Sequence, residues 1–173
     1  MMMFKLLLLL LACSLPMACS HAPRESYVRE AAVPVVTGNV SNSSVLIKGG
    51  DLSLLSFRAG PQAEDNEELD KISGVAINSI KKNLDAQNTA LHVMTDESQE
   101  QPQMFLQGYV QEYSKRSRRH KIVLTGEIWL KSNGQRVLSF SAEQSFDSKK
   151  EKVLEVVYHM GQAIGDFIVR QMQ

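Results

Sequence analysis

The feature that most constrains the fold is a long alternation of apolar and polar residues between Met104 and Phe146. Successive side chains of a β-strand point to opposite faces of a sheet, so a period of two predicts strands with one buried face. Two rows follow this period: Met104, Leu106, Gly108 and Val110 in one segment, and Ile122, Leu124, Gly126, Ile128 and Leu130 in the next. Each row holds a glycine. If the two glycines lie near each other, they open a shallow spot where a helix could approach the sheet.

The segment Ser132–Gln135 predicts a hairpin turn, and the flanking residues select its type. A two-residue Asn-Gly loop would place Ile128 opposite Ser139, so apolar and polar side chains would share the core face. A three-residue loop from 132 to 134, with Gly134 left-handed in a bulge, places Ile128 opposite Leu138 instead. We expect this second register, because it buries one consistent row: Gly126, Ile128, Leu130, Leu138 and Phe140.

Two helices are predicted by apolar residues that recur every three or four positions. The first runs from Glu67 to Leu84, with acidic residues in its first turn. Ser148 and Glu151 have the S-x-x-E spacing of a capping box, which predicts that the second helix starts there and runs nearly to the C-terminus. Gly161 and Gly165 flank its apolar stripe, and in a soluble helix this spacing favours close packing on the sheet.

The remaining segments complete the predicted fold. Val45–Phe57 predicts a strand bent at Gly49-Gly50, Thr89–Met94 a short strand, and Asp96–Pro102 a polar loop. With 173 residues, 43% of them apolar, the chain has room for one domain with its own core. We expect an α+β domain in the order β-α-β-β-β-β-α. Its mainly antiparallel sheet would have about four to five strands, with two helices packed on one face.

The N-terminal segment has the order of a secretory signal. Lys5 supplies a positive charge, Leu6–Leu11 is an unbroken leucine run, and alanine precedes each of two cysteines. The run is shorter than the ~20 apolar residues that cross a bilayer as a helix. Cleavage before Cys19 gives a signal of workable length, residues 1–18, whereas Cys13 follows the more usual leucine but leaves a short signal. Residues 19–44 predict a flexible tether with a short extended piece at 33–36, and residues 45–173 a single domain.

An alanine before a cysteine at the end of a leucine-rich stretch resembles the lipobox of bacterial lipoproteins. From about Val45 to Met172 the layout resembles small Gram-negative envelope lipoproteins, namely YajG-like, curli-secretion-type and flagellar-assembly-type lipoproteins. The resemblance is carried by the helix Glu67–Leu84, the strand pair FLQGYVQEY and IVLTGEIWL, the SNGQ turn and the C-terminal GDFIVRQM. It implies a cysteine that carries diacylglycerol and palmitate. Because serine follows either cysteine, it also implies the outer membrane, with the domain facing the periplasm. It assigns no binding residue.

Chemical motifs are scarce along the chain. The sequence contains no G-x-S-x-G, H-E-x-x-H, C-x-x-C or glycine-rich phosphate loop. Ser79–Lys82 matches the S-x-x-K acylation motif, but it has no S-D-N or K-T-G partner, so chance explains it better. The histidines are scattered: His21, His92, His120 and His159. We therefore expect no enzyme, no catalytic residue, no metal and no cofactor.

Charge concentrates in one segment of a chain whose 19 basic and 19 acidic residues balance. This segment holds Lys115, Arg116, Arg118, Arg119 and Lys121 between two predicted strands. Because a strand cannot bury so many cations without partners, we expect them to project from one hairpin end. They would bind an anionic lipid or an acidic protein, or they would form an ordinary solvated loop. Nucleic acid is excluded by the predicted compartment.

Tyr109, Tyr113 and Trp129 are expected on the outward face of the sheet, where aromatic rings would suit a partner protein unless another layer covers them. Together these features predict a noncatalytic, outer-membrane-anchored lipoprotein that serves as an accessory or assembly factor and binds another envelope component. The alternative is a periplasmic carrier of a lipid or small apolar ligand, which would need a deep apolar cavity.

Overall fold

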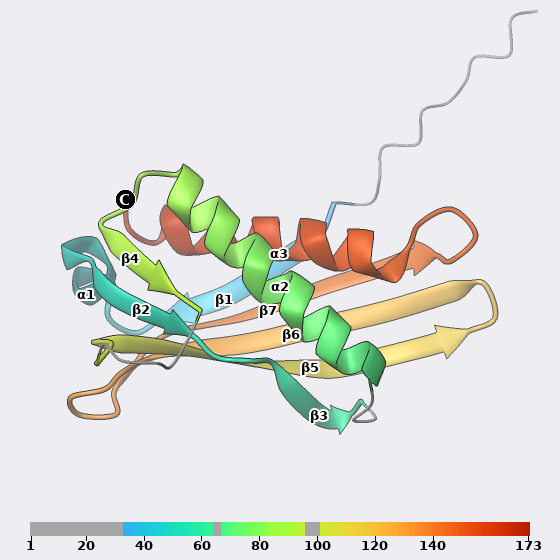
Figure 1. Cartoon of the computed structure of the whole chain (residues 1–173), viewed down its shortest axis with the longest axis horizontal. Helices are drawn as coiled ribbons and strands as arrows, with labels where there is room; N and C mark the ends of the chain where they lie inside the picture. The colour runs from blue at the N-terminus through green and yellow to red at the C-terminus, as the bar shows by residue number, and fades with distance from the viewer. Residues whose placement is uncertain (1–32, 64–66, 96–100) are drawn as a thin grey trace, which may run out of the picture. The chain divides into compact units, whose positions relative to one another are not determined.

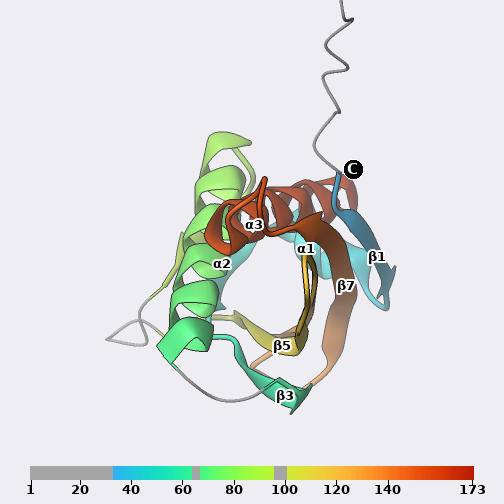
Figure 2. The ribbon, with the colours of Figure 1, turned by 90° about the vertical axis from the view of Figure 1, so that its right-hand side faces the viewer.

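The computed structural model describes residues 33–63, 67–95 and 101–173. The elements are β1 (Val35–Val40), α1 (Ser43–Lys48), β2 (Gly50–Leu54), β3 (Arg58–Gln62), α2 (Glu67–Ala86), β4 (Leu91–Met94), β5 (Met104–Arg116), β6 (Arg119–Leu130), β7 (Arg136–Asp147) and α3 (Val153–Arg170). The long helices α2 and α3 lie on the same face of one sheet (Figures 1 and 2). The predicted signal, both cysteines and residues 96–100 of the predicted polar loop lie outside the described residues.

The sheet has seven strands in the order β1-β7-β6-β5-β2-β4, with β3 paired to β5 beside this path. The α+β class is as predicted, but the sheet is larger than expected and it is mixed. β2 runs parallel to both β4 and β5, and β3 runs parallel to β5. These parallel pairs arise because α2 carries the chain across the sheet between β3 and β4, and only such a crossover lets strands run parallel.

Two elements replace the strand predicted from Val45. Residues 43–48 form the short helix α1, whose Leu46 is fully buried, and β2 follows it. Gly49 lies between them and Gly50 begins β2, with φ angles of 74° and 121°, which glycine adopts at little cost. Val45 and Ile47 are two positions apart, as apolar residues on one face of a strand would be. A helix of six residues is too short to show a helical period that would distinguish it from a strand.

β1 lies within the segment 19–44, which we predicted to be a tether. It pairs antiparallel with β7, from Val35 opposite Glu143 to Val40 opposite Leu138. Residues 35–40 are therefore an edge strand of the sheet. The predicted extended piece at 33–36 overlaps its start. The strand has no regular alternation of burial because it sits at the rim, so the residue pattern did not indicate its full length.

The predicted meander of β5, β6 and β7 is confirmed. Gly108 and Gly126 lie directly opposite each other on β5 and β6. The space above them is taken by aromatic rings and not by a helix: a Cβ at Gly108 would meet the Phe57 ring at 2.4 Å, and one at Gly126 would meet the Phe140 ring at 2.4 Å. Each glycine therefore makes room for a buried phenylalanine of the core.

The β6–β7 turn also follows the predicted register. Ile128 lies opposite Leu138 and Gly126 opposite Phe140, and Gly134 has a φ of 67°. The ladder then shifts between Ile128 and Trp129, so that the Leu130 amide donates to the Gln135 carbonyl at 2.9 Å. The loop is consequently one residue longer than the three predicted.

The two long helices pack on each other in parallel. The ideal Cβ position of Gly161 on α3 lies 2.9 Å from the Ala76 carbonyl oxygen on α2, and that of Gly165 lies 2.5 Å from the Asn83 side chain. We predicted that these glycines permit close packing of the helix on the sheet. That prediction is wrong, because the glycines face α2. The glycines allow two helix backbones to approach where larger side chains would hold them apart.

The predicted capping box of α3 is wrong. The helix starts at Val153, with Lys152 at its N-cap, and within the described part of the chain no side chain caps it. Ser148 instead donates from its amide (2.9 Å) and its hydroxyl (3.4 Å) to the Arg118 carbonyl of the β5–β6 hairpin. This cross-chain contact takes the serine away from the helix end.

Candidate functional site

The outer face of the sheet carries two of the three predicted partner aromatics. Tyr109 on β5 and Trp129 on β6 point away from the helices and are half-buried. Phe105, which the sequence reasoning missed, lies directly opposite Trp129 across the β5–β6 ladder. Its position one residue after the buried Met104 was the signal that could have placed it there. We call Phe105, Tyr109 and Trp129 the aromatic face.

Polar contacts fix the side chains between these rings. The Gln107 amide donates to the Tyr109 hydroxyl at 2.9 Å, and Arg136 donates to Glu127 at 3.0 Å. Arg136 also lies opposite Trp129 on the neighbouring strand β7. No described helix covers this side of the sheet (Figure 2).

Tyr113 does not belong to the aromatic face. A bulge between Val110 and Glu112 shifts the alternation of β5, so Tyr113 lies opposite the buried Ile122 and points toward α2. Its hydroxyl donates to Glu68 at 3.1 Å. Burial, together with the nearby Glu68 carboxylate, raises the pKa of Tyr113 to about 12. The residue thus ties the sheet to α2.

The predicted basic segment divides into engaged and free cations. Lys115 binds Glu68 on α2, and its ammonium lies 4.9 Å from the centre of the Tyr113 ring. This hydrogen bond from Lys115 lowers the pKa of Glu68, although burial opposes the shift. Lys121 sits between Glu143 at 3.2 Å and Glu112 at 3.3 Å, whose carboxylates raise its pKa. These two lysines are therefore part of the sheet's own charge pairing.

Arg116, Arg118 and Arg119 lie at the β5–β6 hairpin end. Arg116 and Arg119 face each other across the last pair of the ladder, and a two-residue turn of Ser117 and Arg118 joins them. Ser117 has a φ of 55°, in the positive range that non-glycine residues rarely adopt. All three arginines are exposed, and among the described residues none of their guanidinium groups has a side-chain partner.

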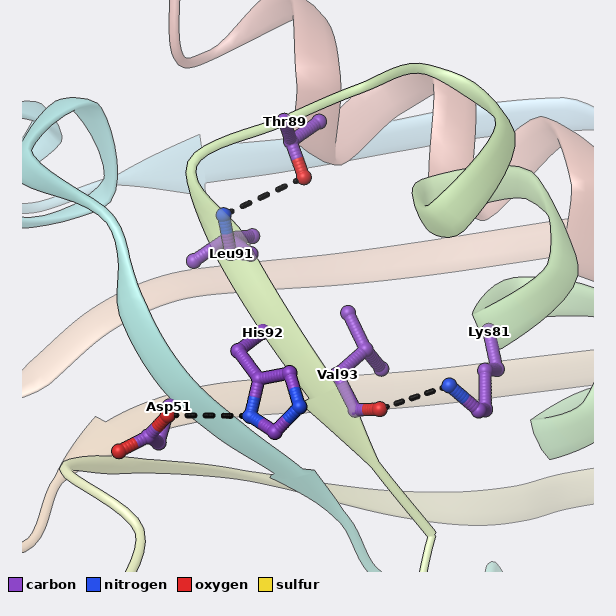
Figure 3. A network of polar contacts seen from close by, with 6 residues as sticks. All are labelled: Asp51, Lys81, Thr89, Leu91, His92 and Val93. Carbon is purple, nitrogen blue, oxygen red and sulfur yellow. Dashed lines mark hydrogen bonds and ion pairs between the residues drawn. The ribbon is translucent and has the colours of Figure 1, made fainter.

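A histidine–carboxylate pair lies at the edge of the sheet that β4 forms. His92 Nδ1 on β4 is 3.2 Å from Asp51 on β2, and Lys81 of α2 donates to the neighbouring Val93 carbonyl (Figure 3). Both members of the pair are exposed, with 68% and 38% of their side-chain surfaces accessible. Water screens such a pair, so it has the character of a surface contact between parallel strands.

Other candidate groups are dispersed. Ser79 of the S-x-x-K match is buried and donates to the Ala76 carbonyl at 2.9 Å, inside the α2–α3 contact. Across residues 33–63, 67–95 and 101–173, no three His, Cys, Asp or Glu side chains gather as metal ligands would. In the same residues no helix is long and apolar enough to cross a membrane.

The space between sheet and helices is filled by side chains. Its core includes Leu52, Ile72, Met104, Leu124 and Met160, all fully buried. The hollows found are open to the surface, for example one of about 610 Å³ between α3, the end of α2 and the start of β1. Within the described residues, these side chains occupy the place where the carrier alternative would need a deep apolar cavity.

Comparison with known proteins shows a shared fold. No family model and no curated protein matches the sequence. The crystal structure of a point variant of the PelC dodecamer from Paraburkholderia phytofirmans superposes with a TM-score of 0.57 at 16% identity, covering 81% of this chain and 97% of that one. A second crystal form of the PelC dodecamer gives 0.56 at 15% identity with the same coverage.

Weaker likenesses follow. The lipoprotein GNA1162 from Neisseria meningitidis gives a TM-score of 0.47 at 11% identity, covering 69% of this chain and 98% of that one. At these identities the comparisons establish the α+β fold type shared with PelC and no more.

Proposed function

We propose that the chain is a noncatalytic lipoprotein of the Gram-negative outer membrane that acts as an accessory or assembly factor. Its leucine-rich start and the alanine-cysteine pairs at Cys19 and Cys13 support acylation and anchoring on the periplasmic side. Several acyl chains on one cysteine make the attachment durable, because a single chain binds a bilayer only marginally.

The domain binds another envelope protein through the aromatic face. The observation that carries this proposal is the row of half-buried rings at Phe105, Tyr109 and Trp129 on a sheet face that no described helix covers. Aromatic residues and arginine are enriched in the centres of protein interfaces, and here Arg136 adjoins Trp129.

Site-specific photocrosslinking in living cells tests this surface. A photoreactive phenylalanine in place of Trp129 should give a discrete crosslinked species. The same residue in place of Tyr158, a half-buried aromatic of α3, serves as the control and should not. Equal crosslinking at both positions, or none at Trp129, would remove the aromatic face as the binding surface. Trp129→Ala and Tyr109→Ala should each weaken capture of the same species.

A homo-oligomer is a second candidate, and the edge strand β1 favours it. Val33 and Val35 are 79% and 64% exposed, and in the described sheet β1 has a strand on one side only. An open edge with exposed valines is suited to pairing with another copy. The two PelC structures, which share this fold type, are dodecamers.

Light scattering on residues 20–173 measures the mass in solution. A homo-oligomer should revert to monomer on Val35→Lys, since charge on an edge strand blocks pairing. Leu154→Lys, at an exposed leucine of α3, should leave the mass unchanged. A monomeric wild-type chain at all concentrations would exclude this candidate.

The anchor has its own test. Mass spectrometry of protein extracted from outer membranes should find an acylated N-terminal cysteine, at Cys19 or at Cys13. Cys19→Ser and Cys13→Ser then decide between the two. Unmodified protein recovered from the soluble periplasm would refute the lipoprotein proposal.

A further inference from the structure

Two loops that are distant in sequence meet at one end of the sheet. The β5–β6 hairpin and the loop from β7 to α3 are joined by the hydrogen bonds from Ser148 to the Arg118 carbonyl. Arg119 and Asp147 are also opposite each other on the β6–β7 ladder. The second loop is itself basic, and Figure 1 shows both loops at the same end. Together they bring six exposed cations to this end: Arg116, Arg118, Arg119, Lys149, Lys150 and Lys152. We call this set the cationic tip.

The carboxylates within the cationic tip are fewer than its cations. Asp147 accepts from the Lys149 amide at 3.0 Å and so holds the loop, and Glu151 is the other carboxylate within it. On the adjacent first turns of the two long helices, Glu67 pairs with Lys71 and Glu68 with Lys115. Asp70 of α2 and Glu155 of α3 add two exposed carboxylates. The tip therefore presents more cations than carboxylates. Such a group of like charges at one end is costly unless an anionic partner meets it.

The position of the cationic tip relative to the chain's N-terminal side points to the partner. Val35, at the start of β1, lies opposite Glu143, about 13 Å along β7 from Asp147 at the tip end. The segment between Cys19 and Val33 spans at most ~50 Å when fully extended. A chain anchored at Cys19 therefore holds the tip within reach of the membrane to which it is attached.

We propose that the cationic tip binds the anionic phospholipid surface of that membrane and sets the domain end-on to it. This inference rests on the anchoring part of the proposed function. The tip is formed by two projecting loops, a shape that suits a flat headgroup layer better than a pocket would. The acyl chains supply attachment, and the tip supplies orientation. In this orientation β6 carries Trp129 away from the membrane, since ten residues of strand separate it from Arg119 by about 33 Å.

Vesicle co-sedimentation of residues 20–173 tests the binding without the acyl chains. These residues include every described residue of the domain. Vesicles with about a third phosphatidylglycerol should bind the protein, and pure phosphatidylcholine vesicles should not. Each cation near an anionic surface strengthens binding about fivefold, so loss of three should weaken it about a hundredfold at low salt. Two triple variants remove such sets: Arg116→Gln, Arg118→Gln, Arg119→Gln, and Lys149→Gln, Lys150→Gln, Lys152→Gln.

A matched control removes the same charge from the opposite end. Lys48 ends α1, Lys131 lies in the β6–β7 turn and Arg170 ends α3, and all three are exposed. Lys48→Gln, Lys131→Gln, Arg170→Gln should bind like wild type. An equal loss in this control would reduce the effect to net charge and overturn the proposal. So would equal binding to both kinds of vesicle. Thermal melting checks that all variants remain folded.

The single tryptophan of the chain reports orientation directly. Brominated phospholipids quench only tryptophans that reach the bilayer, so Trp129 should stay unquenched on vesicles to which the protein is bound. Quenching would mean that the aromatic face lies on the membrane, and it would overturn the end-on arrangement. Binding of the anchored protein to outer membranes should survive loss of the tip. If vesicle binding fails while that attachment persists, this inference falls and the proposed function stands.

Discussion

Gly161→Ala should destabilise the domain although alanine is the better helix former. A Cβ at this position would lie 1.7 Å from the Ser79 hydroxyl and 2.9 Å from the Ala76 carbonyl, so α2 and α3 must separate. Overpacking of this kind costs about 1 to 3 kcal/mol. The gain in helix propensity offsets up to about 1 kcal/mol of it. We expect a net loss of about 1 to 2 kcal/mol in the free energy of unfolding, measured by urea denaturation on residues 20–173.

A matched substitution isolates the steric cause. Gly74→Ala lies in the middle of α2, where nothing in the described part of the chain comes within 4 Å of the added Cβ. It should stabilise by about 0.5 to 1 kcal/mol. Ser79→Ala combined with Gly161→Ala should recover part of the loss, because the nearest atom is gone, and the double-mutant cycle should show favourable coupling. If Gly161→Ala stabilised the protein as Gly74→Ala does, the close helix contact would be refuted.

Three further outcomes are expected. Gly134→Val should cost ~1 kcal/mol or more in unfolding free energy, and Gly134→Asn less, since the φ of 67° disfavours branched side chains while no described atom crowds the site. The pKa of Glu68 is held below its ordinary 4.5, so its contribution to stability is present above that value and is lost as pH falls through the folded pKa. Glu68→Gln should therefore flatten the acid side of the stability profile in urea titrations. The pKa of Tyr113 is raised from 10.0 to about 12, so stability present below pH 10 is lost as pH rises toward 12. Tyr113→Phe should remove one late-ionising tyrosine from the ultraviolet absorbance titration, and an unchanged titration would contradict this assignment.

The sequence predicts those parts of the fold whose evidence is local and periodic. The apolar spacing of α2 and the alternation of β5 to β7 each indicate one buried face, and Gly134 indicates the turn between β6 and β7. The sequence therefore predicts α2, the three strands and the pairing of β6 with β7. β3 was missed because Arg58–Gln62 contains a glycine and a proline and has no buried row. β1 was anticipated only as a short extended piece at 33–36, and its full length and its pairing with β7 were not predicted.

The candidate site was less predictable because its geometry depends on contacts between distant segments. A bulge after Val110 places Tyr113 on the helix side of the sheet. Alternation of apolar and polar residues cannot predict such an inserted residue, so we expected Tyr113 on the outer face. Lys115 and Lys121 pair with carboxylates on α2, β5 and β7. These pairs cannot be predicted from spacing along the chain, because the partners are distant in sequence. The lysines at 149, 150 and 152 lie near the arginines because Ser148 binds the Arg118 carbonyl. The same contact holds Ser148 away from the helix start, where we predicted a capping box.

The pairing of β1 with β7 has a consequence for the order of folding. Synthesis proceeds from the N-terminus, so β1 is the first strand of the sheet to be made and β7 the last. Val35 must wait for Glu143, more than a hundred residues later, before its ladder can form. Contacts this distant in sequence slow folding, because the loop between them must close first. A nascent domain thus carries an unprotected strand with exposed valines until its last hairpin is complete, and this interval is when aggregation or capture by a chaperone competes with folding.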